Sequence, residues 1–212
     1  MPVPFIAVEG PIGVGKTSLS SRIAENFGFD LLKEIVDENP FLNKFYEDID
    51  EWSFQTEMFF LCNRYKQLKD VKKTSINLEK PVVADYHVFK NLIFAKRTLQ
   101  EQEYDKYEKI YEILISDMVT PNAVIYLEAT VDTLMQRIAM RGREFEKMIK
   151  RDYMEQLVAD YKEYIDRFER ENPSIPVLRI NGDACDFVKN EYDLQKILRE
   201  VEELIGKRSI NQ

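Results

Sequence analysis

Histidine and cysteine are scarce in this chain of 212 residues, which has one histidine and two cysteines. The single His87 excludes a histidine-rich metal centre, and Cys62 and Cys185 lie far apart without neighbours at metal-binding spacing. Such cysteine usage is typical of a protein whose thiols stay reduced, so we expect a cytoplasmic location.

Long apolar runs and an excess of basic residues are also lacking. No run approaches the ~20 residues of a membrane-spanning helix, and the start MPVPFIAVEG has neither the basic residues nor the long apolar core of a signal peptide. The 30 Lys and Arg residues face 38 Asp and Glu residues, for a formal net charge of −8. We therefore expect no nucleic-acid or membrane partner, although a local basic site for a small phosphorylated ligand is compatible with this balance.

Short apolar runs alternate with helical patterns along the chain. The runs predict strands at residues 4–8, 30–36, 81–84, 123–127 and 176–180, of which the second is the weakest. The helical patterns cover residues 17–27, 51–71, 91–119, 131–140, 152–171 and 193–205. This alternation favours an α/β fold whose mostly parallel sheet is covered by helices on both faces. Because no linker or repeat interrupts it, we expect one domain over residues 1–206 and a frayed tail at 207–212.

A phosphate-binding motif follows the first predicted strand. Its residues GPIGVGKT match G-x-x-x-x-G-K-[ST] and lie between a predicted strand and a predicted helix. The glycines let backbone N–H groups approach a phosphate, the lysine reaches the β- and γ-phosphates, and the threonine hydroxyl can bind Mg²⁺. The alternative is a glycine-rich turn that matches by chance. We expect ATP to bind through Gly10, Gly13, Val14, Gly15, Lys16, Thr17 and Ser18.

An arginine-rich segment, RIAMRGRE, predicts a lid over the transferring phosphate. Arg137 and Arg141 are four residues apart on one helical face, and Gly142 loosens the backbone before Arg143. Guanidinium groups neutralise the charge that spreads over a phosphoryl group, so we expect these three arginines to be catalytic in a lid at about 137–150. The alternative is a solvated basic helix end. Because the guanine-reading N-K-x-D segment of GTPases is absent, a small kinase fits better than a GTPase switch.

With these motifs in place, the chain resembles the bacterial branch of the deoxynucleoside kinase family over nearly its whole length. The resemblance is carried by the segments EGPIGVGKTS, KEIVDENPFLNKFY, EWSFQTEMFFLCNRYKQL, VVADYHVFKN, RGREFE and NGDACDFV. It implies the P-loop kinase fold with a five-stranded parallel sheet. It also implies transfer of the ATP γ-phosphate to the 5′-hydroxyl of a deoxynucleoside with Mg²⁺, and a homodimer formed through two long helices.

The resemblance assigns roles to acceptor-site residues. Glu34 in KEIVDE is implied to be the general base that takes the proton of the 5′-hydroxyl, for which it must lie within hydrogen-bond reach. Taken alone, Glu34 is also compatible with a surface acid after a strand. Tyr46 and Glu146 are implied to hold the sugar 3′-hydroxyl. Because Glu146 follows Arg143 by three residues, this would couple sugar recognition to lid closure.

Further implied roles concern the metal and the remaining contacts. Asp85, which follows the strand at 81–84, is implied to bind Mg²⁺ together with Thr17 and to contact the substrate. The resemblance also implies that Asn91 belongs to the deoxynucleoside site and that Asp186 and Phe187 frame the adenine of ATP.

One triplet departs from the family pattern. Where the family commonly has an acid, an arginine and a serine, this chain has Asp85-Tyr86-His87. The missing arginine would help to hold Glu34 and the phosphates, and a tyrosine carries no charge at neutral pH. Lys90 and the lid arginines are candidates for its replacement. We do not assign His87 as a base, because Glu34 fills that role.

The second predicted helix carries the residues expected to read the base. Glu57, Phe60 or Leu61, and Arg64 share one helical face, and relatives that take adenine or cytosine have a glutamine in place of Glu57. A carboxylate only accepts hydrogen bonds, which suits the two adjacent donors of guanine, and Arg64 can donate to O6 and the adjacent ring nitrogen. We therefore predict deoxyguanosine as the acceptor. The alternative is Gln55 as base reader, with Glu57 an ordinary helix charge.

Three other functions stay open at this point. A deoxyadenosine/deoxycytidine kinase would share the family's chemistry. A nucleoside monophosphate kinase needs extra cations in the acceptor pocket, where KEIVDENP supplies mainly acids. A non-catalytic nucleotide-binding regulator is favoured only by the missing arginine.

Overall fold

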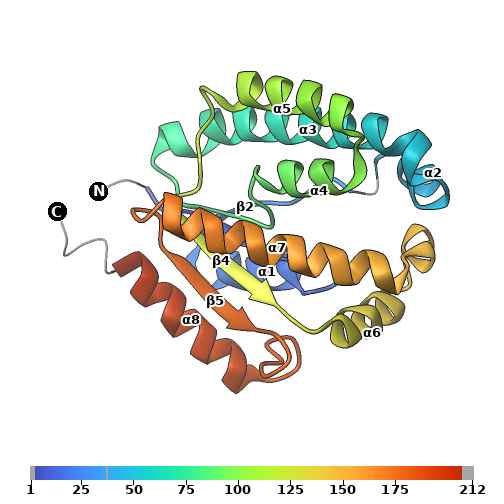
Figure 1. Cartoon of the computed structure of the whole chain (residues 1–212). Helices are drawn as coiled ribbons and strands as arrows, with labels where there is room; N and C mark the ends of the chain where they lie inside the picture. Colours follow the sequence, from blue (N-terminus) through green and yellow to red (C-terminus); the bar gives the residue numbers. More distant parts are fainter. Residues whose placement is uncertain (1–2, 37, 207–212) are drawn as a thin grey trace.

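Five parallel strands form the centre of the computed structural model, which describes residues 3–36 and 38–206 (Figure 1). The strands are β1 (Phe5–Glu9), β2 (Asp30–Leu32), β3 (Val82–Ala84), β4 (Ala123–Glu128) and β5 (Val177–Asn181). Their order in the sheet is β2-β3-β1-β4-β5, and every neighbouring pair is parallel, which confirms the predicted five-stranded sheet. The carboxyl ends of all strands therefore meet at one edge, where open α/β sheets bind ligands.

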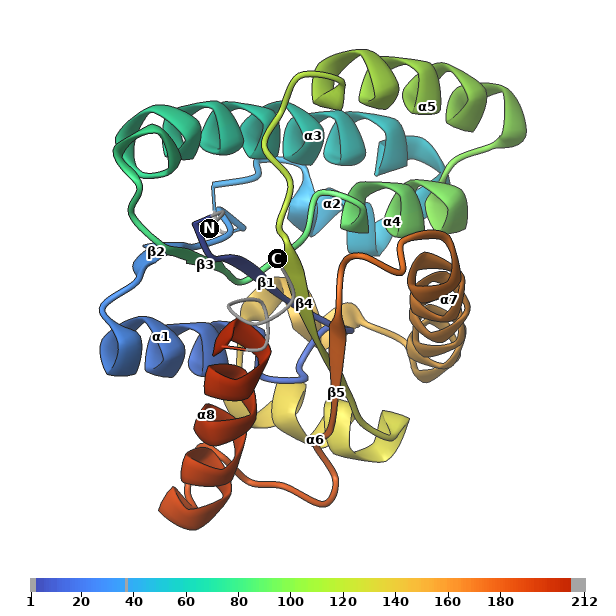
Figure 2. The ribbon, with the colours of Figure 1, turned by 90° about the vertical axis from the view of Figure 1, so that its left-hand side faces the viewer.

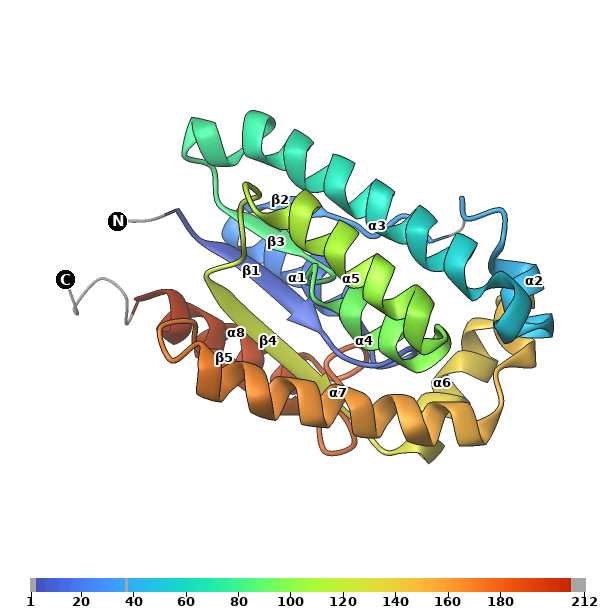
Figure 3. The same ribbon diagram turned by 45° about the horizontal axis from the view of Figure 1, so that its top comes forward.

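Helices cover both faces of this sheet, as predicted. Figure 2 shows α1 and α8 on one side and α3, α4 and α5 on the other, and Figure 3 shows α3 and α5 lying side by side. Two short 3-10 helices, η1 (Ile76–Leu78) and η2 (Glu144–Met148), interrupt the connections. The α-helices are α1 (Lys16–Phe27), α2 (Leu42–Glu47), α3 (Ile49–Thr74), α4 (Lys90–Thr98), α5 (Glu101–Ile115), α6 (Val131–Arg141), α7 (Arg151–Glu171) and α8 (Glu191–Gly206).

Two buried clusters hold these layers together. One joins the middle of the sheet to α1, α6, α7 and α8, and the other joins β2 and β3 to α3, α4 and α5. Every residue of β1 and β3 is buried, as expected for strands covered on both faces, and this explains why they are apolar except for Glu9 at the end of β1. The loops that follow these strands therefore start from rigid positions.

The second strand is shorter than its sequence pattern predicted. The pattern covered residues 30–36, but β2 ends at Leu32. Beyond it, the Glu34 N–H donates to Asp85 Oδ1 at 2.6 Å instead of to a neighbouring strand. A side-chain acceptor thus ends the ladder, and the chain turns along the carboxyl edge of the sheet.

Other boundaries also differ from the prediction. The helical pattern at 91–119 is divided into α4 and α5, because the backbone is extended at Leu99 and Gln100. The short helix α2 was not predicted, and the tail expected at 207–212 lies outside the described residues. Both cysteines are free thiols, and within the described ranges no helix is long and apolar enough to cross a membrane.

Candidate active site

A cavity of about 660 Å³ opens at the carboxyl edge of the sheet. Its walls come from the loops after β1, β2, β3 and β5, from α3, and from the segment that joins α6 to η2. Two predicted site residues, Gly10 and Asn91, are outside the lining described for it. The predicted residues that line it are Gly13, Val14, Gly15, Lys16, Thr17, Ser18, Glu34, Tyr46, Glu57, Arg64, Asp85, Arg137, Arg141, Arg143, Glu146, Asp186 and Phe187.

The loop between β1 and α1 forms one end of the cavity. Gly10 has a φ of +147°, and a Cβ there would lie 2.2 Å from the Leu127 carbonyl oxygen of β4, so only glycine fits. Lys16 Nζ donates to the carbonyl oxygens of Gly10 at 2.7 Å and Pro11 at 2.9 Å. Burial and then the Lys90 ammonium lower the pKa of Lys16 to about 8. The loop thus places a cation at the N-terminus of α1, an arrangement that binds phosphate.

Thr17 and Asp85 connect this loop to the segment after β3. Thr17 Oγ1 donates to Asp85 Oδ2 at 2.8 Å, while Asp85 Oδ1 accepts the Glu34 N–H. Burial and then the Glu34 carboxylate raise the pKa of Asp85. A hydroxyl and a carboxylate are the hard oxygen donors that Mg²⁺ prefers, and Mg²⁺ commonly takes only one or two protein ligands beside water and phosphate. The two side chains therefore fit the predicted metal role.

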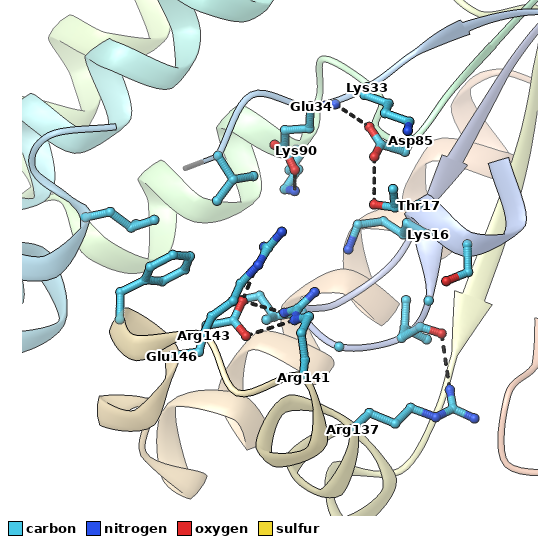
Figure 4. Close-up of a pocket in the computed structure, with 18 of the residues that line it drawn as sticks. Lys16, Thr17, Lys33, Glu34, Asp85, Lys90, Arg137, Arg141, Arg143 and Glu146 are labelled. Carbon is cyan, nitrogen blue, oxygen red and sulfur yellow. Dashed lines mark hydrogen bonds and ion pairs between the residues drawn. The ribbon is translucent and has the colours of Figure 1, made fainter. Parts of the chain in front are cut away.

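Glu34 is held by two cations at the cavity wall. Arg64 donates to Glu34 Oε1 through Nε at 3.1 Å and through Nη2. Lys90 Nζ donates to Glu34 Oε2 at 2.7 Å (Figure 4). The three side chains are between 4% and 9% exposed. Burial alone would raise the pKa of Glu34, but Lys90 and then Arg64 hold it well below its usual range. Glu34 is therefore ionised before any ligand binds.

Lys90 and Arg64 supply cations beside Glu34, whereas the triplet after β3 supplies none. The Tyr86 hydroxyl is turned away and donates to a glutamine side chain of α3 at 3.0 Å. His87 Nδ1 accepts the Phe89 N–H at 3.1 Å, and the two rings stack with centroids 4.1 Å apart. Burial lowers the pKa of His87 to about 3. His87 is thus a neutral, packed residue, which agrees with leaving it out of the catalytic set.

Arg64 is anchored from behind by Asn91. Its Nη1 donates to Asn91 Oδ1 at 2.7 Å, and Asn91 Nδ2 donates to the Tyr107 hydroxyl at 2.7 Å. The guanidinium also packs on the Phe60 ring, 4.9 Å from its centroid. Asn91 thus contacts Arg64 and Tyr107, and its predicted substrate role stays a prediction. The three nitrogens of Arg64 donate to Glu34 and Asn91.

The three arginines predicted for the lid separate into two groups. Arg141 Nε donates to the Glu146 carboxylate at 2.9 Å, and Arg143 Nη1 lies 3.7 Å from the same group. Arg137 instead donates to backbone carbonyl oxygens of the phosphate loop, at 3.2 Å, and of the loop after β5, at 2.8 Å. Figure 4 shows Arg137 turned away from Lys16. The structure brings Arg141 and Arg143 to the cavity mouth, whereas Arg137 ties two loops together.

Tyr46 and Glu146, the pair implied for the sugar, lie close together. Tyr46 stacks on Phe145, with ring centroids 6.5 Å apart and an interplanar angle of 5°. Burial and then the Glu146 carboxylate raise the pKa of Tyr46. A hydroxyl donor and a carboxylate acceptor thus stand side by side, as recognition of a sugar hydroxyl requires.

The loop after β5 covers the outer side of the phosphate loop. A Cβ added at Gly15 would lie 3.0 Å from Phe187 Cζ, so the phenyl ring rests on the phosphate loop. Asp186 lines the cavity beside it. Both residues therefore lie beside the phosphate loop, and their implied contact with the adenine of ATP stays a prediction.

Glu57 faces the middle of the cavity. It is 2% exposed, and its Oε2 has no hydrogen-bond partner among the described residues. Burial raises the pKa of Glu57 to about 8, against the lowering effect of Arg64 and Lys90. Gln55, the alternative base reader, is exposed and is not among the lining residues described. Glu57 therefore offers an unused carboxylate oxygen to the cavity, next to the hydroxyl of Thr56, which is equally unpartnered within the described part of the chain.

Glu9 is a buried carboxylate that the sequence reasoning missed. It ends β1 with 0% exposure and accepts the N–H groups of Gly10 at 2.9 Å and His87 at 2.7 Å. Burial raises its pKa, and the Lys90 ammonium lowers it. Glu9 joins the phosphate loop to the segment after β3. Its only signal in the sequence is an acid at the end of an apolar strand.

Known proteins share this arrangement along nearly the whole chain. A family model described as deoxynucleoside kinase matches residues 6–206. Over 202 residues the chain is 50% identical to the deoxyguanosine kinase of Bacillus subtilis (strain 168), covering 95% of this chain and 98% of that protein. It is 30% identical over 205 residues to the deoxyadenosine/deoxycytidine kinase of the same strain, covering 95% and 93%. The solved structure of deoxyadenosine kinase from M. mycoides with bound dATP matches with a TM-score of 0.80 at 25% identity, covering 94% of this chain and 99% of that chain.

Proposed function

This chain belongs to the deoxynucleoside kinase family, and from that premise we propose that it is a deoxyguanosine kinase. It transfers the γ-phosphate of ATP to the 5′-hydroxyl of deoxyguanosine and releases dGMP. The observation that carries the choice of base is Glu57, a buried carboxylate with an unpartnered oxygen at the cavity wall. The deoxyguanosine kinase of Bacillus subtilis, at 50% identity, supports the same choice.

Residues at one end of the cavity bind the triphosphate, and residues at the other end act on the acceptor. Lys16 and the backbone N–H groups of its loop hold the triphosphate. Glu34 accepts the proton of the 5′-hydroxyl while that oxygen attacks the γ-phosphorus. Arg141 and Arg143 stabilise the charge that develops on the transferring group, since both face the same space (Figure 4).

The sugar and the metal are assigned to the neighbouring side chains. Tyr46 and Glu146 hold the 3′-hydroxyl, a role that their proximity supports. Thr17 and Asp85 hold Mg²⁺, because their oxygens lie 2.8 Å apart beside the phosphate loop. When bound, Mg²⁺ neutralises charge on the β- and γ-phosphate oxygens.

Base selection follows from the hydrogen-bonding edge of each base. Guanine presents two adjacent donors, its ring N–H and its exocyclic amine, to the two oxygens of Glu57. Adenine presents one donor and one acceptor, so its ring nitrogen would face a carboxylate oxygen with no proton between them. Such a buried mismatch is expensive because neither acceptor finds a donor.

A coupled assay of ADP formation with a panel of acceptors tests this function directly. We expect kcat/KM for deoxyguanosine to exceed that for deoxyadenosine and deoxycytidine by at least about 10²-fold. Preference for deoxyadenosine would show that the base assignment is wrong. Turnover of dGMP instead of deoxyguanosine would favour a nucleoside monophosphate kinase, and a lack of ADP formation with every acceptor would favour a non-catalytic nucleotide-binding regulator.

Deoxyguanosine binding should also depend on pH through Glu57, whose pKa is raised to about 8. Guanine pairs with the ionised carboxylate, so binding must displace the proton that Glu57 carries below pH 8. We expect the affinity to weaken by up to about tenfold per pH unit as the pH falls from 8 to 6.

Calorimetric titration with deoxyguanosine alone measures this dependence. Arg64, Lys90 and Glu34 are the charged groups that act on Glu57. Arg64 and Glu34 stay ionised in this range, because the pKa of Arg64 is raised and the pKa of Glu34 is held well below its usual range. The matched control is Glu57→Gln, which has no proton to lose. A constant affinity between pH 6 and 8 in the unmodified protein contradicts the role of Glu57.

Four further features belong to the proposal. Residues 1–206 form one domain and residues 137–150 form its lid, since Arg141 and Arg143 approach the cavity from this segment. The protein is a homodimer, as the family resemblance implies, and light scattering would give twice the chain mass. Its location is the cytoplasm, which suits two free thiols.

A further inference from the structure

Lys90 lies at a position where a lysine is expected to lower the stability of the folded protein. It is the first residue of α4, where the positive end of the helix dipole repels a cation, and it is 6% exposed. Its ammonium is also near a second lysine, because after burial it is the largest influence that lowers the pKa of Lys16. Proteins break such local rules mainly at functional sites.

The contact of Lys90 blocks the oxygen that a base needs. Its Nζ donates to Glu34 Oε2 at 2.7 Å, while Arg64 occupies Oε1. A cation thus donates a hydrogen bond to each oxygen of Glu34. Transfer of the 5′-hydroxyl proton to Oε2 is therefore favoured once Lys90 leaves that oxygen.

Of these two cations, Lys90 is the one that can move. Arg64 is fixed by its bond to Asn91, at 2.7 Å, and by the Phe60 ring. Within the described residues, the ammonium of Lys90 makes a single hydrogen bond and lies 5.5 Å from the centroid of the Phe94 ring, and it ends a flexible four-carbon stem. Figure 4 shows Lys90, Lys16 and Arg143 directed toward the same space, where the transferring phosphate would lie.

We propose that Lys90 is a further catalytic residue, whose ammonium passes from Glu34 Oε2 to an oxygen of the transferring phosphoryl group once both substrates are bound. The inference rests on the proposed function. The bond from O5′ to the γ-phosphorus forms while the bond from that phosphorus to the bridging oxygen breaks, and its electrons leave with ADP. The proton of the 5′-hydroxyl moves to the freed Glu34 Oε2, and Lys90 keeps its own protons throughout.

This transfer would link the readiness of the base to the presence of the donor. Without a γ-phosphate, Lys90 stays bonded to Glu34 Oε2, the oxygen that would take the proton. With a γ-phosphate in place, the same charge stabilises the transition state, where electrostatic contacts contribute most.

Substitution of Lys90 gives the kinetic test. We expect Lys90→Met to lower kcat by about 10²-fold while the dissociation constant for deoxyguanosine, measured by calorimetry, changes less than about threefold. Lys90→Arg should recover part of kcat, because it keeps the charge. The control is Lys66→Met, which removes an exposed lysine of α3 outside the cavity lining described above. A kcat for Lys90→Met within about threefold of the unmodified protein overturns the inference.

A second test uses the unmodified protein, so it does not depend on whether a variant folds. It is a crystal structure with deoxyguanosine, ADP, Mg²⁺ and aluminium fluoride bound. We expect Lys90 Nζ within hydrogen-bond distance of a fluoride and no longer bonded to Glu34 Oε2. An ammonium that stays on Glu34 overturns the inference while leaving the proposed function intact. Failure of Glu34 to contact the 5′-oxygen, or failure of the unmodified protein to phosphorylate deoxyguanosine, instead overturns the proposed function.

Discussion

Replacing Glu34 with glutamine should lower kcat by about 10³-fold while deoxyguanosine still binds, because the change removes the group that accepts the 5′-hydroxyl proton. The amide keeps an oxygen for Arg64, which donates to Glu34 Oε1 at 3.1 Å through Nε. It cannot take a proton at neutral pH. The base contributes to the transition state and not to ground-state binding, so kcat and kcat/KM should fall together.

The Glu34→Gln variant should also be less stable. Measuring its melting temperature beside its kcat separates the structural role of Glu34 from its catalytic role. Glutamine leaves Lys90 and Arg64 without a counter-charge although their side chains are 8% and 4% exposed, and unpaired buried charges are costly. Melting curves measure that loss. The control Glu38→Ala removes an exposed acid four residues away and should change neither property. If kcat of Glu34→Gln stays within about tenfold of the unmodified protein below its melting temperature, Glu34 is not the base.

The sheet and the phosphate loop were predictable because their information is local. An apolar run before GPIGVGKT and a helix after it define strand, loop and helix without reference to the rest of the chain. Gly10 shows the limit of this reasoning. The motif predicts a glycine for phosphate approach, whereas the structure shows that its lack of a side chain also admits the β4 carbonyl oxygen of Leu127.

The network around Glu34 was less predictable because it joins distant segments. Glu34 follows β2, Arg64 lies on α3 and Lys90 begins α4, and no spacing in the sequence shows that their side chains meet. The missing arginine of the triplet indicated that another cation must compensate. The sequence did not show whether that cation is Lys90 or one of the lid arginines. Tertiary packing makes that choice, since Lys90 lies one turn beyond the triplet on the same side of the cavity.

The helical pattern around Arg137 predicted its face correctly but not its contacts. Four-residue spacing places Arg137 and Arg141 on one side of α6. Of these two residues, Arg141 pairs with Glu146. Arg137 lies deeper, where two backbone carbonyl oxygens need donors. Satisfying buried carbonyl groups is a requirement of the folded state that a sequence pattern does not display.

Glu57→Gln should reverse the base preference, shifting the ratio of kcat/KM for deoxyguanosine over deoxyadenosine by about 10³- to 10⁴-fold. The amide supplies one donor and one acceptor, which pair with the acceptor and donor of adenine. The same amide sets an N–H group against a donor of guanine, so one buried donor on each side stays unpaired. Because Glu57 is 2% exposed, water cannot relieve either mismatch.

The size of this change depends on burial, and a surface control measures that dependence. Glu51→Gln makes the same chemical change two turns earlier on α3, at an exposed position outside the cavity lining described for the chain. It should leave the ratio unchanged, because solvent satisfies its side chain. Parallel assays with both deoxynucleosides decide the matter. A ratio that Glu57→Gln leaves within about threefold of the original would place base recognition elsewhere, whereas a reversal with unchanged kcat for the preferred base would show that the carboxylate reads the base and takes no part in phosphoryl transfer.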